Sequence, residues 1–245
     1  MDDQPHPILH IHRREACIQR AAAGDTAGAT IIVDAFRAFS TTADLLARRV
    51  DRIVLADTLE EARSIARATT GSILCGEDGG RRPADFDIGN SPVEARAFSD
   101  PAGRVVVMHT SSGTRGVVAA LRSGADPVFA ASLTVATATA DAVRSEPRVT
   151  IVATGLSGTS IADEDEETAG LIAEHLLNTT HDGQRLNRLR TGEGAARLRT
   201  TPWIDPADLE CCLEIGRHSF ALRARLERGV PTLRALETPD CSPDS

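Results

Sequence analysis

Short runs of apolar residues recur along the chain, and most of them are rich in β-branched side chains. The six runs span residues 29–36, 52–57, 71–77, 103–110, 127–132 and 148–155. They are too short for helices and too continuously apolar for strands with one face in water. The pattern therefore predicts strands that are buried on both faces.

Segments with helical spacing, rich in alanine, leucine and arginine, lie between several of these runs. They cover residues 41–50, 58–68, 113–124 and 132–145. Strands that alternate with helices are typical of an α/β fold, in which helices cover both faces of a parallel sheet through right-handed crossovers. We therefore predict an α/β fold with a mostly parallel sheet.

Two parts of the chain break this alternation. Residues 76–98 are rich in glycine, proline and acidic residues, and we interpret them as a long ordered loop, a kind of loop that is usually functional. After Gly170 the pattern favours helices at 171–177 and 207–229, separated by a polar connector that contains glycine.

The chain has no internal repeat and no linker that would mark two domains. We therefore expect a single α/β domain over residues 28–235. Residues 1–27 are expected to form an N-terminal extension with the first element, and residues 236–245 a flexible tail.

Composition narrows the range of functions. Of the 245 residues, 41% are hydrophobic and 25% are charged, as in an ordinary globular domain. A net charge of -8, with one Trp and no Tyr, disfavours binding to nucleic acid or to an anionic membrane. All 27 basic side chains are arginine, which excludes mechanisms that need a lysine. An anionic ligand must therefore be bound by local arginines, by backbone N–H groups or through a metal.

The five cysteines form no C-x-x-C pair and are odd in number, so they predict neither a disulfide framework nor a structural zinc site. No signal pattern or membrane-spanning stretch is evident in the sequence. We therefore expect a cytoplasmic protein with reduced thiols and no membrane partner.

Polar residues follow the predicted strands at the ends where an α/β sheet binds its ligands. These residues are Asp34 and Arg37, then Glu77 and Asp78, then His109 to Thr114, and finally Thr154 and Gly155 before the acidic run Asp163–Glu167. Carboxylates suit Mg²⁺, which proteins commonly bind through one or two carboxylates together with a substrate phosphate. A turn rich in Ser and Gly that opens a helix suits the phosphate itself.

Each of these features also has a local explanation. Thr41 and Asp44 have the spacing of a helix capping box. Asp34 and Arg37 could pair with each other, and the SSGTRG stretch at 111–116 could simply be a capped helix start. The acidic run is also typical of a solvated helix N-terminus. The motifs of serine hydrolases, zincins and dinucleotide-binding proteins are absent.

Taken in order, several stretches resemble the 2-phosphosulfolactate phosphatase (ComB-like) family. They are VDAFRAFSTT at 33–42, CGEDGG at 75–80, ADFDIGNSP at 84–92, VMHTSSGT at 107–114, AASLTVATATA at 130–140, ATGLSGTSIADEDEETAG at 153–170 and DLECCLEIG with RGVP at 208–231. The resemblance covers roughly residues 28–235. The FDIGNSP stretch is a specific signal of this family. The other stretches are moderate signals singly, but their order along the chain makes them a strong signal together.

The resemblance implies a three-layer α/β/α fold and a Mg²⁺-dependent acid phosphatase. The family reaction removes phosphate from 2-phospho-3-sulfolactate during coenzyme M synthesis. The implied roles are catalysis by Asp34 and Arg37, metal binding by Asp34, Glu77, Glu164 and Asp165, and substrate or phosphate binding by Arg37, Thr41, Asn90, Ser91, Ser111, Ser112, Gly113 and Thr114. Whether water or a carboxylate such as Asp34 attacks phosphorus is left open.

The sequence also departs from the family pattern. Asp78 stands where the family has Arg, and Ser112 stands where the family has Asn. Near Val135 a family Asn is also missing. The change at position 78 removes a cationic partner for the substrate, for which Arg81 and Arg82 in the same loop could compensate. Alternatively, the substrate has changed to one with less negative charge or with a cationic group that Asp78 would favour.

Three hypotheses therefore stand at this stage. The first is a phosphatase acting on a small phosphorylated acid. The second is a repurposed phosphatase that hydrolyses another phosphate monoester in specialised metabolism. The third is a catalytically inactive relative that binds an anion. The oligomeric state is left open.

Overall fold

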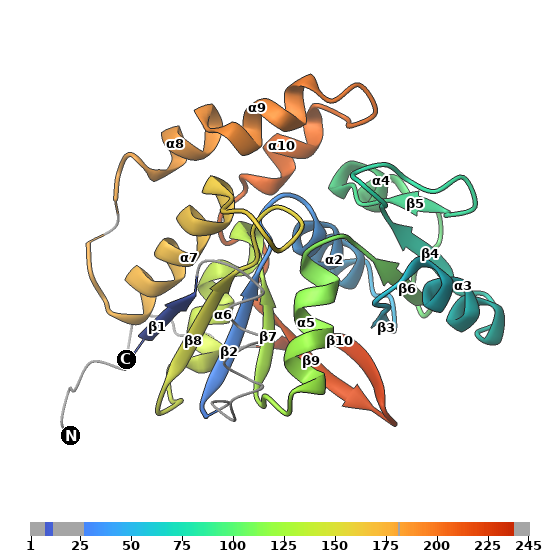
Figure 1. Cartoon of the computed structure of the whole chain (residues 1–245), viewed down its shortest axis with the longest axis horizontal. Coiled ribbons are helices and arrows are strands. Elements are labelled where there is room, and N and C mark those ends of the chain that lie inside the picture. Colours follow the sequence, from blue (N-terminus) through green and yellow to red (C-terminus); the bar gives the residue numbers. More distant parts are fainter. Residues whose placement is uncertain (1–7, 12–26, 181, 238–245) are drawn as a thin grey trace.

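The computed structural model describes residues 8–11, 27–180 and 182–237. Within these residues ten strands form one sheet in the order β1-β8-β2-β7-β9-β10-β3-β6-β4-β5 (Figure 1). The strands are β1 Ile8–Ile11, β2 Ala29–Val33, β3 Arg52–Leu55, β4 Ile73–Gly76, β5 Ile88–Gly89, β6 Val105–His109, β7 Val128–Ala131, β8 Val149–Ala153, β9 Phe220–Glu227 and β10 Val230–Glu237. All six predicted strands are present.

The sheet consists of two parallel halves joined by an antiparallel hairpin. One half is β1-β8-β2-β7 and the other is β3-β6-β4-β5. The hairpin β9–β10 pairs antiparallel with β7 on one side and with β3 on the other. The sheet is therefore mixed but mostly parallel, as predicted.

Helices follow most strands, and the four predicted ones are among them. The helices are α2 Ala38–Ala47, α3 Leu59–Ala68, α4 Pro92–Ala97, α5 Gly113–Arg122, α6 Ala136–Val143, α7 Asp163–Leu176, α8 Arg185–Thr191, α9 Glu193–Thr200 and α10 Ala207–Cys212, with a 3-10 turn at Leu133–Val135. No helix among the described residues is long and apolar enough to cross a membrane.

Alternate side chains of each central strand face opposite helical layers, because strand side chains have a period of two. In β2, Ile32 packs with α2 and α5, whereas Ile31 and Val33 pack with α6 and α7. In β3, Val54 faces the layer that contains α3. Helices thus cover both faces of the sheet, which confirms the three-layer α/β fold.

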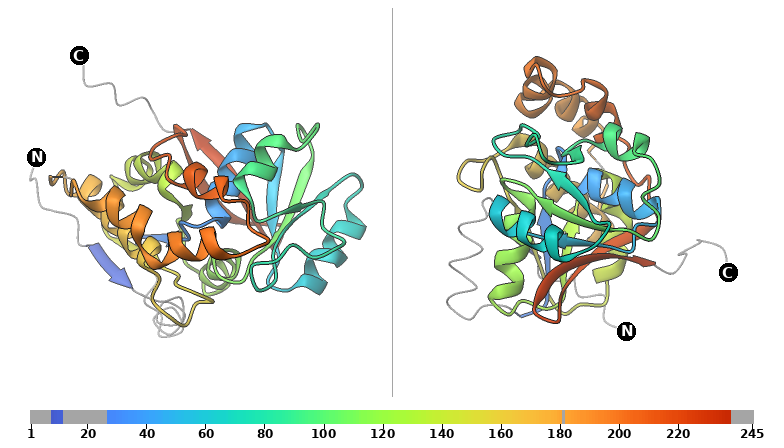
Figure 2. Two further views of the ribbon diagram at one scale, coloured as in Figure 1. Left: turned by 90° about the horizontal axis from the view of Figure 1, so that it is seen from above. Right: turned by 90° about the vertical axis from the view of Figure 1, so that its right-hand side faces the viewer.

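Helices α8, α9 and α10 form a fourth group, which we call the roof. Figure 1 shows them across the top of the molecule, above the carboxyl ends of β2 and β8, and Figure 2 shows the same group from above and from the side. Leu189, Leu198 and Leu209 of the roof share a small apolar cluster with Leu133 and Phe36. The roof is therefore packed onto the strand ends.

The interpretation of residues 76–98 as one long loop is wrong in its second half. This segment contains the short strand β5 and the helix α4. Ser91 is the N-cap of α4, its hydroxyl accepts a hydrogen bond from Glu94 N at 3.1 Å, and Pro92 is the first helical residue. These local signals explain the helix.

The predicted helix at 207–229 is also wrong beyond Cys212. The segment continues into β9, in which Leu222 and Ala224 are buried and the alternate residues Arg223 and Arg225 are more exposed. Arg228 and Gly229, both with positive φ, make the turn into β10, and eight residue pairs join the two strands. Short apolar patterns do not distinguish helix from strand when sheet partners lie elsewhere in the chain.

Strands lie near both ends of the expected domain. β10 extends to Glu237, two residues past the expected limit at 235. At the other end, β1 pairs in parallel with β8 at the sheet edge, within the expected N-terminal extension. The rest of that extension and the tail from 238 lie outside the described residues.

Candidate active site

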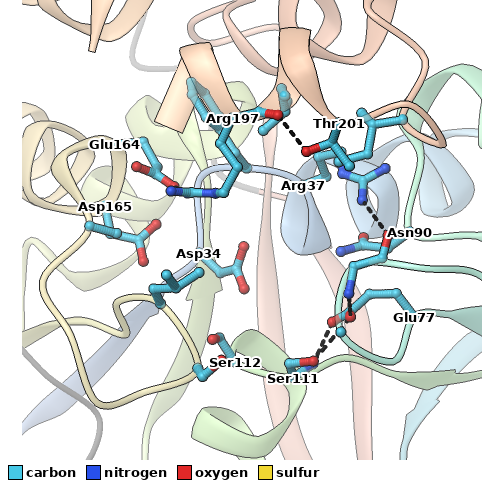
Figure 3. Close-up of a pocket in the computed structure, with 18 of the residues that line it drawn as sticks. Asp34, Arg37, Glu77, Asn90, Ser111, Ser112, Glu164, Asp165, Arg197 and Thr201 are labelled. Carbon is cyan, nitrogen blue, oxygen red and sulfur yellow. Dashed lines mark hydrogen bonds and ion pairs between the residues drawn. The ribbon is translucent and has the colours of Figure 1, made fainter. Parts of the chain in front are cut away.

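A pocket of about 320 Å³ lies between the roof and the carboxyl ends of β2, β4, β6 and β8. Strand ends and the loops after them supply Asp34, Phe36, Arg37, Glu77, Gly79, Gly80, Asn90, Ser111, Ser112, Gly155, Leu156 and Ser157, and α7 with the residue before it supplies Ala162, Glu164 and Asp165. The roof supplies Arg197, Leu198, Thr201, Trp203 and Ile204. Figure 3 shows Glu164, Asp165 and Asp34 on one side of this pocket, and Arg37, Asn90 and Glu77 on the other.

Asp34 follows the last residue of β2 and is only 8% exposed. Its carboxylate accepts hydrogen bonds from the backbone N–H groups of Ala38 and Gly113. Gly113 opens α5, and a Cβ atom at this position would lie 2.7 Å from Asp34 Oδ2. Glycine at 113 thus allows the start of α5 to approach the carboxylate closely.

The pKa of Asp34 is raised to about 8. Burial is the main cause, and the nearby carboxylates of Asp165 and Glu77 raise it further. The N–H groups of Ala38 and Gly113 only partly compensate. A buried acid in this state favours either a proton or a cation next to it.

Asp165 ties the ends of β2 and β8 together. One carboxylate oxygen accepts a hydrogen bond from Ala35 N at 2.8 Å, and the other accepts from Gly155 N at 2.9 Å and from the Thr154 hydroxyl at 3.2 Å. Burial raises the pKa of Asp165 to about 6, while these donors lower it. Its first role in the structure is therefore to hold two strand ends in place.

Glu164 is also buried, which contradicts the solvated interpretation of the acidic run for this residue and for Asp165. Its Oε1 forms an ion pair with Arg197 Nη2 from the roof, and its Oε2 is buried without a hydrogen-bond partner among the described residues. Burial and the neighbouring Asp163 raise the pKa of Glu164 to about 9, and Arg197 opposes this shift.

Glu77 lies on the other side of the pocket, after β4. Its Oε1 accepts a hydrogen bond from Ser111 N at 2.6 Å, and its Oε2 accepts from the Ser111 hydroxyl at 3.0 Å and from Gly80 N at 2.5 Å. Glu77 thus fixes the turn before α5 and the loop after β4 relative to each other.

Arg37 pairs with Asp208 and not with Asp34. Arg37 Nη1 donates to Asp208 Oδ2 at 3.0 Å, and Nη2 donates to the Gly80 carbonyl at 3.4 Å. The other Asp208 oxygen accepts from the Ser91 hydroxyl at 2.6 Å and from Val93 N at 3.1 Å. This buried pair joins the start of α2 to α10 in the roof.

The residues expected to bind phosphate fall into two groups. Asn90, Ser111 and Ser112 line the pocket, and the Ser112 hydroxyl donates to the Gly155 carbonyl at 2.9 Å. The others lie behind the lining: Thr41, Ser91, Gly113 and Thr114. The SSGTRG stretch does open a helix, but Ser112 at its N-cap makes no side-chain capping bond.

The capping box at Thr41 and Asp44 is wrong, because α2 begins at Ala38 and Thr41 lies inside it. The Thr41 hydroxyl is buried and donates to the Arg37 carbonyl at 3.0 Å and to Asn90 Oδ1 at 3.3 Å. Thr41 therefore supports Arg37 and Asn90 from behind.

The departure at position 78 does not lie in the pocket lining. Asp78 is exposed and forms a tight turn with Arg81 through two backbone hydrogen bonds. Arg81 stacks over the Trp203 ring at 4.0 Å, and Arg82 pairs with Glu94. Neither arginine lines the pocket, so neither replaces a cation in the lining.

Sequence reasoning missed the contribution of the roof. Arg197 and Trp203 lie in the segment that was interpreted as a polar connector, and Asp208 carried no expected role. The arginine-rich helical pattern of 185–200 was the one available signal. It does not indicate which of these arginines faces a pocket.

The net charge of the side chains that line the pocket suits a bound divalent cation. Of the charged side chains that line the pocket, four are acids and two are arginines. Two hydrogen bonds only partly compensate Asp34, and Oε2 of Glu164 has no partner among the described residues, whereas Glu77 and Asp165 each accept three hydrogen bonds. No group of three or more side chains among the described residues forms a protein metal cage. Mg²⁺ commonly needs only one or two carboxylates, with water and substrate completing its shell.

The fold and the pocket define an α/β protein with a pocket at the carboxyl edge of its sheet, the place where such sheets bind their ligands. The sequence profile of the 2-phosphosulpholactate phosphatase family matches residues 16–220. The chain therefore belongs to this family, which confirms the resemblance.

Several curated relatives share the name "Probable 2-phosphosulfolactate phosphatase". The one from Thermus thermophilus is 40% identical over 148 residues, which is 60% of this chain and 60% of the relative. The one from Pseudothermotoga lettingae is 33% identical over 158 residues, covering 64% and 66%. The one from Deinococcus radiodurans is 36% identical over 149 residues, covering 60% and 61%. The chain thus matches a little under two thirds of the length of each.

Proposed function

We propose that this protein is a Mg²⁺-dependent phosphatase that hydrolyses a small phosphorylated acid, with 2-phospho-3-sulfolactate as the first substrate to test. The observation that carries this proposal is the surroundings of Asp34. This carboxylate is buried against the start of α5, close to Asp165 and Glu77, in a pocket with more acids than arginines. A bound cation and a phosphate together would balance those charges.

Asp34 and Glu164 are the residues that would hold Mg²⁺, with Glu77 and Asp165 close by. When bound, Mg²⁺ supplies charge neutralisation and polarises a phosphoryl oxygen. Side chains of the chain would position the phosphate: Ser111, Ser112 and Asn90 line the space beside Asp34. The N–H groups of Ser111 and Gly113 already donate to Glu77 and Asp34. The pocket volume of about 320 Å³ suits a small acid.

Two routes of attack fit this arrangement. In one, a water molecule forms the new O–P bond while the ester O–P bond breaks. In the other, an Asp34 oxygen forms that bond first, and water then releases phosphate from the acyl phosphate. Acid quenching during turnover followed by borohydride reduction distinguishes them, because only the second route forms a phosphorylated Asp34, which borohydride reduces to homoserine.

The test of the proposed function is phosphate release by the purified protein, with Mg²⁺ and with excess chelator. The substrates are phosphosulfolactate, phospholactate, phosphoglycerates and several sugar and nucleoside monophosphates. We expect release that depends on the metal and is fastest for a small phosphorylated acid. Release that is fastest for a sugar or nucleotide phosphate would favour the repurposed phosphatase.

An inactive anion-binding relative is the second candidate. It is favoured by the hydrogen bonds that already occupy Glu77 and Asp165, two of the four expected metal ligands. Such a protein would bind the phosphorylated acids with equal affinity in Mg²⁺ and in chelator, and would release no phosphate from any of them.

A further inference from the structure

We propose that Arg197 determines specificity by binding the second anionic group of the substrate, the carboxylate or sulfonate that hydrolysis leaves in place. This inference deepens the proposed function and rests on it. It starts from the two arginines that line the pocket, Arg37 and Arg197.

Arg37 is committed to the protein. Its side chain is 8% exposed, and both terminal nitrogens have partners, Asp208 and the Gly80 carbonyl. The carboxylate of Asp208 is itself fixed by Ser91 and Val93. Moving Arg37 toward a ligand would leave the buried Asp208 without its ion pair, which is costly.

Arg197 is in the opposite situation. Its side chain is 36% exposed, and within the described part of the chain its guanidinium has one partner, Glu164, through Nη2. Nε and Nη1 are therefore available to a ligand. Nε and Nη1 lie on different sides of the guanidinium, so each can donate a separate charge-assisted hydrogen bond to an oxygen of a carboxylate or a sulfonate.

The backbone around Arg197 is firmly docked, so its position over the pocket is defined. Asp163 accepts hydrogen bonds from Glu193 N at 2.8 Å and from Gly194 N at 3.0 Å, which attaches the start of α9 to α7. A Cβ atom at Gly194 would lie 2.2 Å from Glu164 Oε2, so α9 lies directly on Glu164. Arg197 follows three residues later, on the same side of the helix.

Arg197 and the serines before α5 lie on opposite sides of the pocket. Figure 3 shows Arg197 reaching down from the roof, with Ser111 and Ser112 on the opposite side of the pocket and Asp34 between them. A phosphate held at the start of α5 directs the remainder of the substrate toward the roof. The guanidinium of Arg197 is the cationic group it meets there.

The test is calorimetric titration of 3-sulfolactate, which carries the second anion but no phosphate, in the presence of Mg²⁺. The variants are Arg197→Gln and the control Arg199→Gln, an exposed arginine two residues along the same helix that donates to the Arg190 carbonyl. We expect Arg197→Gln to weaken binding by about 10- to 100-fold, the usual effect of losing a charge-assisted contact. Arg199→Gln should bind as the wild type does.

Inorganic phosphate serves as the second ligand. It tests only the part of the pocket formed by the strand ends, which we call the floor. Its affinity should be unchanged in Arg197→Gln. Equal losses for phosphate and sulfolactate, wild-type sulfolactate binding by Arg197→Gln, or absence of sulfolactate binding by the wild type would each overturn the proposal. The single tryptophan, Trp203, lines the pocket, so its fluorescence provides an independent measure of occupancy.

A purely structural role for the Arg197–Glu164 pair is tested with Arg197→Lys. This variant keeps the charge, and we expect it to restore part of the sulfolactate affinity. If Arg197→Lys has the wild-type melting temperature but binds no better than Arg197→Gln, the proposal is wrong. Phosphate release is measured separately. If the wild type binds sulfolactate through Arg197 but releases no phosphate from any substrate, the proposed phosphatase function is wrong and the inference about Arg197 still holds.

Discussion

The floor and the roof of the pocket are held by different kinds of contact. The floor consists of strand ends, where carboxylates such as Asp165 and Glu77 accept hydrogen bonds from backbone N–H groups. The roof has a contact of this kind at Asp163, which accepts from Glu193 N and Gly194 N. Its contacts with the floor run through its own side chains: Asp208 pairs with Arg37, Arg197 pairs with Glu164, and the Trp203 indole donates to the Gly80 carbonyl at 3.1 Å.

This difference suggests different roles for the floor and the roof. Backbone donors do not change rotamer, so the floor keeps the proposed phosphate and metal site rigid. Side-chain pairs can exchange a partner for a ligand, which suits a surface that recognises the rest of the substrate. Changes in the floor should therefore affect catalysis most, and changes in the roof should affect stability or specificity.

The largest effect is expected from Asp34→Asn in the floor. It keeps the shape but removes the charge that the proposed cation needs, so activity should fall by about 10²–10³-fold or more, comparable with the loss of a key electrostatic contact in other enzymes. Phosphate release and circular dichroism provide the measurement.

Asp57→Asn is the matched control for Asp34→Asn. Asp57 is partly exposed and held in surface ion pairs with Arg115 and Arg122, which contribute little. It should retain activity. Full activity in Asp34→Asn would remove Asp34 from the mechanism.

Arg37→Ala breaks the buried link between floor and roof. Asp208 would be left buried without its ion pair, so the free energy of unfolding should drop by about 3–5 kcal/mol. Urea unfolding measures this loss. The double variant Arg37→Ala with Asp208→Asn should recover part of it, because the buried charge is gone. A double variant as unstable as the single one would show that packing, rather than charge, dominates.

Gly113→Ala tests the close approach of α5 to Asp34. The added Cβ would lie 2.7 Å from Asp34 Oδ2 and 3.0 Å from Phe39 Cζ, so the helix start or the carboxylate must shift. We expect a loss of about 1–3 kcal/mol in stability from overpacking, and a loss of activity of up to about 10²-fold from misplacement. Gly183→Ala, with nothing within 4 Å of its Cβ, is the control and should change neither.

The buried acids predict the pH dependence of stability without metal. Folding raises the pKa of Asp34 to about 8, of Glu164 to about 9 and of Asp165 to about 6. The folded state therefore binds more protons than the unfolded state above about pH 4, and stability is lost as pH rises through the folded pKa values.

The melting temperature in chelator should accordingly fall from pH 5 to pH 9, by about 2–4 °C for each kcal/mol lost. Mg²⁺ should reduce this fall, because it binds the deprotonated acids and replaces the protons. Asp34→Asn should also flatten the profile. A melting temperature that is constant or rises over this range would contradict the raised pKa values of these buried carboxyl groups.

The smallest effect is expected from Asp78→Arg, which restores the family residue. Asp78 is exposed and outside the pocket lining, so kcat/KM for phosphosulfolactate should stay within about twofold of the wild type, in line with the small effects of most surface substitutions. A large gain would show that the loop after β4 contacts the substrate and that the change at position 78 altered specificity.

The amino-acid sequence by itself was sufficient for the six strands of the continuous apolar runs and for most of the floor. Continuous apolar runs mark strands that are buried on both faces, and parallel strands end at one edge of a sheet. For that reason Asp34, Glu77, Ser111 and Asp165 were expected together before their contacts were known. The family resemblance rested on the same stretches, and the family profile confirms it.

Only the tertiary structure decided which residues form pairs and what covers the pocket. Arg37 and Asp208 are 171 positions apart, and β9 is a strand because β7 and β10 offer it partners. The burial of Glu164 depends on α9 packing against it. Local sequence patterns do not predict such contacts. The energy of an interaction between residues far apart in the sequence depends on burial and geometry, which arise only after the chain has folded.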